Sequence, residues 1–146
     1  MRTAFVTLFF ALGVATAGDK AEAEKELQKF QGTWTFDVVE VEGKKVPAAD
    51  YKEMSVTFDG EKYIVKEGKE LLQSGTQKLD PSQSPKTMDV KVAEGPYKGT
   101  VILGIYEING DTLKVCFDPE GKKRPTQFQT TAGSPVTLVV HQRMKK

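Results

Sequence analysis

The sequence predicts an all-β domain: an antiparallel meander of about eight short strands that closes into a barrel, preceded by one short helix. Along most of the chain, apolar residues alternate with polar ones, which is the period of a half-buried strand. Asp59-Gly60 and Asn109-Gly110 separate such stretches, and both pairs are typical of tight hairpins. No long helical segment intervenes, so neighbouring strands are expected to be antiparallel. Closing the sheet into a barrel would leave no strand edge unpaired. A β-sandwich is the competing architecture.

The N-terminus has the three regions of a secretory signal peptide in the expected order. Arg2 supplies a positive charge, residues 4–14 form an apolar run, and Ala15-Thr16-Ala17 supplies small residues at the cleavage site. We therefore predict a signal peptide at residues 1–17, cleaved between Ala17 and Gly18. The apolar run is too short to span a bilayer comfortably. The alternative is a buried N-terminal helix or strand. The signal predicts a periplasmic or extracellular protein.

The mature chain, residues 18–146, is expected to form one barrel domain that is not inserted in a membrane. The whole chain has 21 Lys and Arg against 20 Asp and Glu. A nucleic-acid-binding protein or an electrostatic membrane-surface protein needs a basic face, so near-neutrality argues against both classes. Cys116 is the single cysteine, which excludes an intramolecular disulfide. The core alone must therefore stabilise the domain.

A short amphipathic helix is predicted between Asp19 and Gly32. Asp19 is a suitable N-terminal cap, and Gly32 is a suitable end. Leu27 and Phe30 fall on the apolar face of this helix. We expect these two residues to cover the outer side of the strand at residues 101–108, because both faces of that strand are apolar.

The strands are expected from Trp34 onward. A switch in the phase of alternation after Val38 predicts a β-bulge there. Residues 47–51 are typical of a short helical turn with proline in its first turn. Two prolines make residues 80–85 a loop. The expected strands lie near residues 34–41, 56–58, 63–65, 72–79, 88–92, 101–108, 113–117, 128 and 136–140.

Gly32-Thr33-Trp34 opens the first strand directly after the helix, and Arg143 lies near the end of the last strand. This arrangement resembles the lipocalin pattern of G-x-W near the start and a basic residue near the end. In lipocalins the tryptophan closes one end of the barrel and the arginine packs over its ring. The resemblance implies that Trp34 and Arg143 close one end of a lipocalin-like barrel here.

A second resemblance extends over most of the mature chain. The segments that carry it are LQKFQGTW (27–34), PSQSPKTMDV (81–90), GPYKGTVILGIYEINGDTLKVCF (95–117) and RPTQF (124–128). They are similar to an uncharacterised family of small domains known mainly from planctomycetal genomes, and GIYE-x-x-GDTLK-x-CF is the most specific part. The resemblance implies a lipocalin-like fold and no assigned activity.

The chain offers little that could carry catalysis. Cys116 and His141 could form a nucleophile–base pair of a small hydrolase or isomerase, but both lie within expected strands, and a packed thiol is the favoured interpretation. Zinc needs several His or Cys ligands, and the chain has two such residues in all. No phosphate-binding glycine loop occurs. We expect no enzymatic activity, no metal and no cofactor.

Beside the small hydrolase or isomerase, which is the least favoured alternative, the sequence leaves two non-catalytic functions open. The first is a binding module that holds a small apolar or amphipathic ligand in the barrel, with Phe58, Met88 and Tyr106 as its contacts. The second is a barrel filled by side chains that acts as a structural or interaction module for an envelope protein. Its working surface would be the loops at residues 44–50, 80–86 and 120–124. The sequence predicts no particular oligomeric state.

Overall fold

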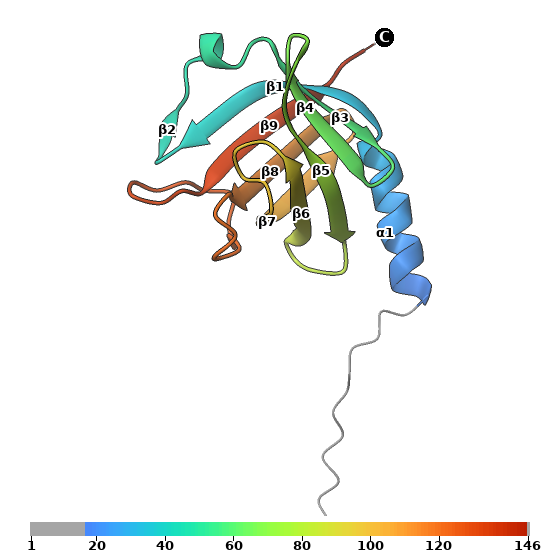
Figure 1. The fold of residues 1–146 in the computed structure, drawn as a ribbon. Coiled ribbons are helices and arrows are strands. Elements are labelled where there is room, and N and C mark those ends of the chain that lie inside the picture. Colours follow the sequence, from blue (N-terminus) through green and yellow to red (C-terminus); the bar gives the residue numbers. More distant parts are fainter. Residues whose placement is uncertain (1–16, 146) are drawn as a thin grey trace, which may run out of the picture.

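A computed structural model describes residues 17–145, which form an antiparallel barrel of eight strands and one N-terminal α-helix (Figure 1). The predicted signal peptide lies outside the described residues except for Ala17, at which the helix begins. The elements are α1 (Ala17–Phe30), β1 (Gly32–Val41), β2 (Lys44–Lys45), the 3-10 helix η1 (Ala48–Asp50), β3 (Met54–Asp59), β4 (Lys62–Glu67), β5 (Glu70–Asp80), β6 (Lys86–Glu94), β7 (Val101–Asn109), β8 (Thr112–Asp118) and β9 (Thr137–Arg143).

The barrel is a closed meander. From β3 to β9 each strand pairs antiparallel with the next, β3 also pairs with β1, and β9 returns to pair with β1. Trp34 of β1 is the register partner of Arg143 of β9 at the seam. The two-residue strand β2 extends the edge of β1 and is not part of the ring. The predicted barrel is therefore confirmed, and the β-sandwich is excluded.

The predicted local features of the strands are present. Gly60 and Gly110 each have a φ of 59°, and they turn the β3–β4 and β7–β8 hairpins. A backbone with positive φ favours glycine because a side chain there would meet its own carbonyl. The register of β1 against β9 shifts between Phe36 and Val38, which confirms the predicted bulge.

Helix α1 closes one end of the barrel, where the aromatic core is concentrated. Phe30, the last residue of the helix, is fully buried, and its ring makes edge contacts with Phe58 (5.3 Å between centroids) and Tyr106 (5.1 Å). Leu27 packs against the same cluster. The prediction that α1 covers the outer side of β7 was wrong. The amphipathic pattern shows which helix face is buried but not which surface buries it.

The segment between β8 and β9 covers the outer side of β7 and β8 instead. Cys116 is completely buried there, and its thiol lies 3.8 Å from the carbonyl oxygen of Gln129. Its register partner on β7, Ile105, is also buried. From the same segment, Arg124 donates a hydrogen bond of 2.8 Å to the carbonyl oxygen of Gly104. This small outer core explains why both faces of β7 are apolar.

Residues 119–136 form this cover without a strand. The predicted strand around Phe128 is therefore wrong. The ring of Phe128 lies under the ammonium group of Lys114, 5.3 Å from Nζ to the ring centroid, on the outside of the barrel. Phe128 is half-buried by this contact and not by strand pairing. Within residues 17–145, no helix is long and apolar enough to cross a membrane.

Candidate functional site

The barrel encloses a cavity of about 490 Å³. Each of the eight barrel strands contributes at least one inward-facing side chain to its wall, among them Phe58 on β3, Met88 on β6 and Val115 on β8. Most of these side chains are apolar. The volume falls in the range of roughly 300–1,000 Å³ that is usual for small-molecule sites. The interior of this barrel is thus only partly filled by its own side chains.

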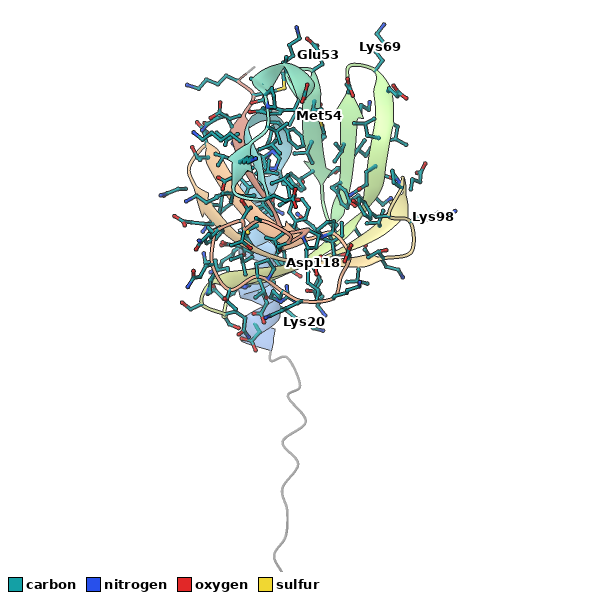
Figure 2. All side chains as sticks on the ribbon, turned by 90° about the vertical axis from the view of Figure 1, so that its left-hand side faces the viewer. Lys20, Glu53, Met54, Lys69, Lys98 and Asp118 are labelled. Atoms are coloured by element: carbon teal, nitrogen blue, oxygen red, sulfur yellow. The ribbon has the colours of Figure 1, made fainter. Side chains whose placement is uncertain are left out.

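The cavity reaches the surface at the end of the barrel opposite to α1. Pro96 and Tyr97 of the β6–β7 loop line it and are exposed, and Tyr97 is 42% exposed. Met54 at the start of β3 and Leu72 of β5 are half-buried on the same rim. Figure 2 shows Met54 at the end of the molecule opposite to Lys20 of α1. We call this opening the mouth and the end near α1 the floor.

Gln77 is the most unusual polar residue of the wall. It lies on β5 and is 3% exposed, and neither its amide nitrogen nor its amide oxygen has a hydrogen-bond partner among the described residues. Leu79 points to the same face two residues later and belongs to the core that closes the barrel. Gln77 therefore lies at the floor of the cavity. A buried amide without a partner is rare in proteins, because its desolvation is not compensated.

The other polar groups of the wall are uncharged at neutral pH. The Gln73 amide donates a hydrogen bond of 2.9 Å to the Tyr63 hydroxyl. Burial raises the pKa of Tyr63, and this bond opposes the rise only in part. The Tyr63 hydroxyl can still donate its own hydrogen, since an O–H group both donates and accepts.

His141 lines the cavity from β9. Its Nδ1 lies 3.3 Å from the carbonyl oxygen of Thr35, and its ring meets Phe36 edge-on at 4.5 Å between centroids. Burial lowers the pKa of His141 to about 4, and the bond to Thr35 opposes this only weakly. The ring is neutral at pH 7. Because a carbonyl can only accept, this bond requires Nδ1 to carry the hydrogen, and Nε2 is an acceptor.

Two of the three predicted ligand contacts line the cavity, and the third lies outside it. Phe58 and Met88 line the cavity. Tyr106 does not, because it lies beneath the floor with its ring against Phe30. Burial, together with the nearby Glu26 carboxylate, raises the pKa of Tyr106. The alternation of side chains along the strands predicts that Tyr106 faces the interior, as Phe58 and Met88 do. The ring of Phe30 lies against Tyr106 and separates it from the cavity.

Gln77 was missed in the sequence. It belongs to a weakly patterned strand, and glutamine is an ordinary surface residue. The alternation of side chains along the strand is the signal that predicts it. Gly75, Gln77 and Leu79 are on the same face of β5, and all three are buried. A polar residue in the inward phase of a strand is a candidate for a buried polar group.

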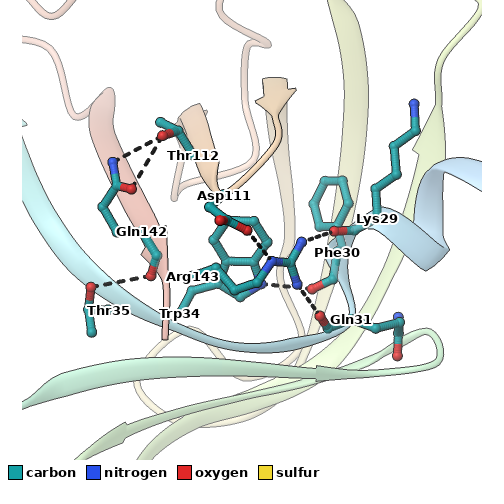
Figure 3. A network of polar contacts seen from close by, with 9 residues as sticks. All are labelled: Lys29, Phe30, Gln31, Trp34, Thr35, Asp111, Thr112, Gln142 and Arg143. Atoms are coloured by element: carbon teal, nitrogen blue, oxygen red, sulfur yellow. Dashed lines mark hydrogen bonds and ion pairs between the residues drawn. The ribbon is translucent and has the colours of Figure 1, made fainter. Parts of the chain in front are cut away.

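Trp34 and Arg143 close the floor from below (Figure 3). The guanidinium of Arg143 donates hydrogen bonds to the carbonyl oxygens of Lys29 (2.6 Å) and Gln31, and it pairs with Asp111 at 3.0 Å. These bonds occupy the carbonyl oxygen of Lys29 in the last turn of α1, which has no helical partner, and that of Gln31, one residue beyond the helix. They fix α1 across the end of the barrel.

Cys116 and His141 are not brought together. The thiol of Cys116 faces Gln129 outside the wall, whereas His141 faces the cavity. Burial raises the pKa of Cys116. A protonated thiol and a neutral imidazole on opposite sides of a sheet cannot act as nucleophile and base. Within residues 17–145, no group of three or more His, Cys, Asp or Glu side chains is placed to hold a metal ion.

A second hollow, of about 460 Å³, lies between Asp118 and Val136 on the outside of the barrel, and most of the residues around it are polar or charged. Asp118 accepts hydrogen bonds there from the backbone nitrogens of Glu120, Lys122 and Lys123, at 2.9–3.1 Å. These bonds outweigh the effect of burial and lower the pKa of Asp118. The carboxylate therefore serves to fold the loop, and among residues 17–145 no buried side-chain atom without a partner belongs to this hollow.

No protein-family model matches the chain, and no curated protein and no solved structure matches it either. Its function has to be inferred from the cavity and the side chains around it.

Proposed function

We propose that this chain is an exported, non-catalytic binding protein whose barrel holds one small apolar or amphipathic molecule. The observation that carries the proposal is the cavity of about 490 Å³ inside the closed barrel. The interior of a small eight-stranded barrel is either filled by side chains or holds one small ligand. Burial of an apolar molecule against this wall would be driven by roughly 25 cal/mol for each Å² removed from water.

The closed end supports a lipocalin-like assignment as part of the proposal. The tryptophan in the first strand and the arginine over its ring are the features that the G-x-W pattern implies. Trp34 is fully buried, and Arg143 lies 4.2 Å from its ring centroid. A barrel closed at one end and open at the other gives a ligand a single route of entry, through the mouth at Tyr97.

A neutral fluorescent probe, N-phenyl-1-naphthylamine, tests the proposal. Val90 of β6 lines the cavity as the register partner of both Gln77 and Ile102, so Val90→Phe places a ring inside the cavity. Val139→Phe fills it from the other side of the barrel and guards against a local folding defect. Val101→Phe makes the same substitution at a position that is 44% exposed, and it is the matched control.

Saturable binding of the probe by the native chain and by Val101→Phe is expected, with affinity at least tenfold weaker in both cavity variants. Thermal unfolding of all four proteins checks that they are folded, because overpacking a core commonly costs about 1–3 kcal/mol. If the native chain fails to bind the probe, or if folded Val90→Phe and Val139→Phe bind it as well as the native chain does, the proposal is wrong.

A further inference from the structure

We propose that Gln77 receives an uncharged polar head group of the ligand at the floor of the cavity, so that the barrel selects neutral amphipathic molecules over ionised ones. This inference rests on the proposed function and adds to it the orientation and the chemical class of the ligand. Two independent observations on the described part of the chain carry it: the amide without a partner at the floor and the absence of charged side chains from the lining.

The first observation concerns hydrogen bonding. The Gln77 side chain can donate two hydrogen bonds and accept two, and neither its nitrogen nor its oxygen has a partner among residues 17–145. A buried polar group left without a partner is destabilising, because nothing replaces the hydrogen bonds that it made to water. The backbone nitrogen of Gln77 donates a hydrogen bond of 2.8 Å to the Glu61 carbonyl oxygen, so it is the side chain of Gln77 that lacks partners. A ligand group that both donates and accepts would satisfy both ends of the side chain.

The second observation concerns charge. No Lys, Arg, Asp or Glu is among the described residues that line the cavity. His141 is neutral near pH 7, because burial lowers its pKa to about 4. An ionised head group at the floor would lose its hydration and find no opposite charge, which is strongly unfavourable. A primary amide or a hydroxyl loses far less on burial and can bond to Gln77.

The wall above Gln77 sets the orientation of the ligand. Towards the mouth the wall is apolar, with Val65 of β4 and Leu72 of β5 on the route to Tyr97. An amphipathic molecule with its head at Gln77 would lay its hydrocarbon part against these side chains. The reverse orientation would place the hydrocarbon against the amide of Gln77 and leave that buried amide without a partner.

Displacement of bound N-phenyl-1-naphthylamine by a matched pair of ligands tests the inference. Decanamide and decanoate share an alkyl chain and differ in the charge of the head group at pH 7.5. Gln77→Met removes the amide and keeps the length of the side chain. Gln127→Met makes the same change at an exposed position and serves as the control.

We expect decanamide to displace the probe from the native chain at a concentration at least tenfold lower than decanoate. Gln77→Met should weaken decanamide about three- to tenfold relative to the probe, whose own affinity for each variant is measured first, whereas Gln127→Met should change neither affinity. If decanoate displaces the probe as well as decanamide, or if Gln77→Met binds decanamide unchanged, the inference is wrong and the proposed function still stands. If the probe does not bind the native chain, the proposed function itself is wrong.

Discussion

The guanidinium of Arg143 lies over the indole ring of Trp34, with Cζ 4.2 Å from the ring centroid. The Trp34 indole nitrogen donates a hydrogen bond of 2.7 Å to the carbonyl oxygen of Phe30, so the stack joins both terminal strands of the barrel to the end of α1. The strand seam and the helix that closes the floor therefore depend on the same pair of side chains.

We predict that Arg143→Ala lowers the free energy of unfolding by about 2–3 kcal/mol. The substitution removes a cation–π contact and the hydrogen bonds to two helix-end carbonyls, each worth about 0.5–2 kcal/mol. The free energy of unfolding of Arg143→Lys should lie between those of the native chain and Arg143→Ala, because lysine keeps the positive charge but lacks the planar guanidinium. Urea unfolding measures both. Lys145→Ala, at an exposed neighbouring position, is the control. An Arg143→Ala protein as stable as this control would contradict the assignment.

The local chemistry of the chain made much of the fold predictable. Asp59-Gly60 and Asn109-Gly110 determine their hairpins because few residues other than glycine tolerate positive φ. The bulge near Val38 was visible because a one-residue insertion reverses the side of every later side chain. Closure followed from the number of strands and from the tight turns between them.

The elements that sequence could not place are those held by long-range packing. Residues 119–136 have no periodic pattern, and the half-buried ring of Phe128 lies against Lys114 of β8. The helix is amphipathic in the sequence, but Phe30 could have packed on any apolar surface. Its insertion at the end of the barrel sets the floor, which is why Phe58 and Met88 face the cavity and Tyr106 does not.

His141 makes stability depend on pH. Its pKa in the folded chain is about 4, and the ordinary value is about 6.5, so the unfolded chain binds the proton more tightly. The contribution of the neutral ring to the free energy of unfolding is fully present above about pH 6.5, and it is lost as the pH falls towards 4. Between pH 7.5 and 5 we expect a loss of about 2 kcal/mol in the native chain. In His141→Gln this part of the loss should be absent. Equal losses in both proteins would show that His141 is not responsible.

Cys116 should be unreactive in the folded protein. The thiol is completely buried beneath residues 119–136, and burial raises its pKa, so the thiolate is scarce. Ellman's reagent should modify the native chain at least a hundredfold more slowly than the chain unfolded in guanidinium chloride. Because the chain has one cysteine, the signal reports this site alone. Rapid modification under native conditions would contradict the buried position.

Gln77→Met should stabilise the protein without ligand. Replacing a buried amide that has no partner by an apolar side chain of similar length removes a desolvation cost, and we expect a gain of about 1–2 kcal/mol. Urea unfolding is the measurement, and the exposed Gln127→Met should stay within about 0.5 kcal/mol of the native chain. A loss of stability in Gln77→Met would show that the amide has a partner in the folded protein.

The methionines offer the most direct test of a ligand inside the barrel. Met54 and Met88 line the cavity, and Met144 lies outside it, 50% exposed. In protein labelled with carbon-13 at the methionine methyl groups, the resonances can be assigned by Met→Leu variants. Addition of decanamide should shift the Met88 and Met54 resonances and leave Met144 in place. If Met88 does not respond to a ligand that binds, or if Met144 alone responds, the ligand lies outside the barrel and the central claim is wrong.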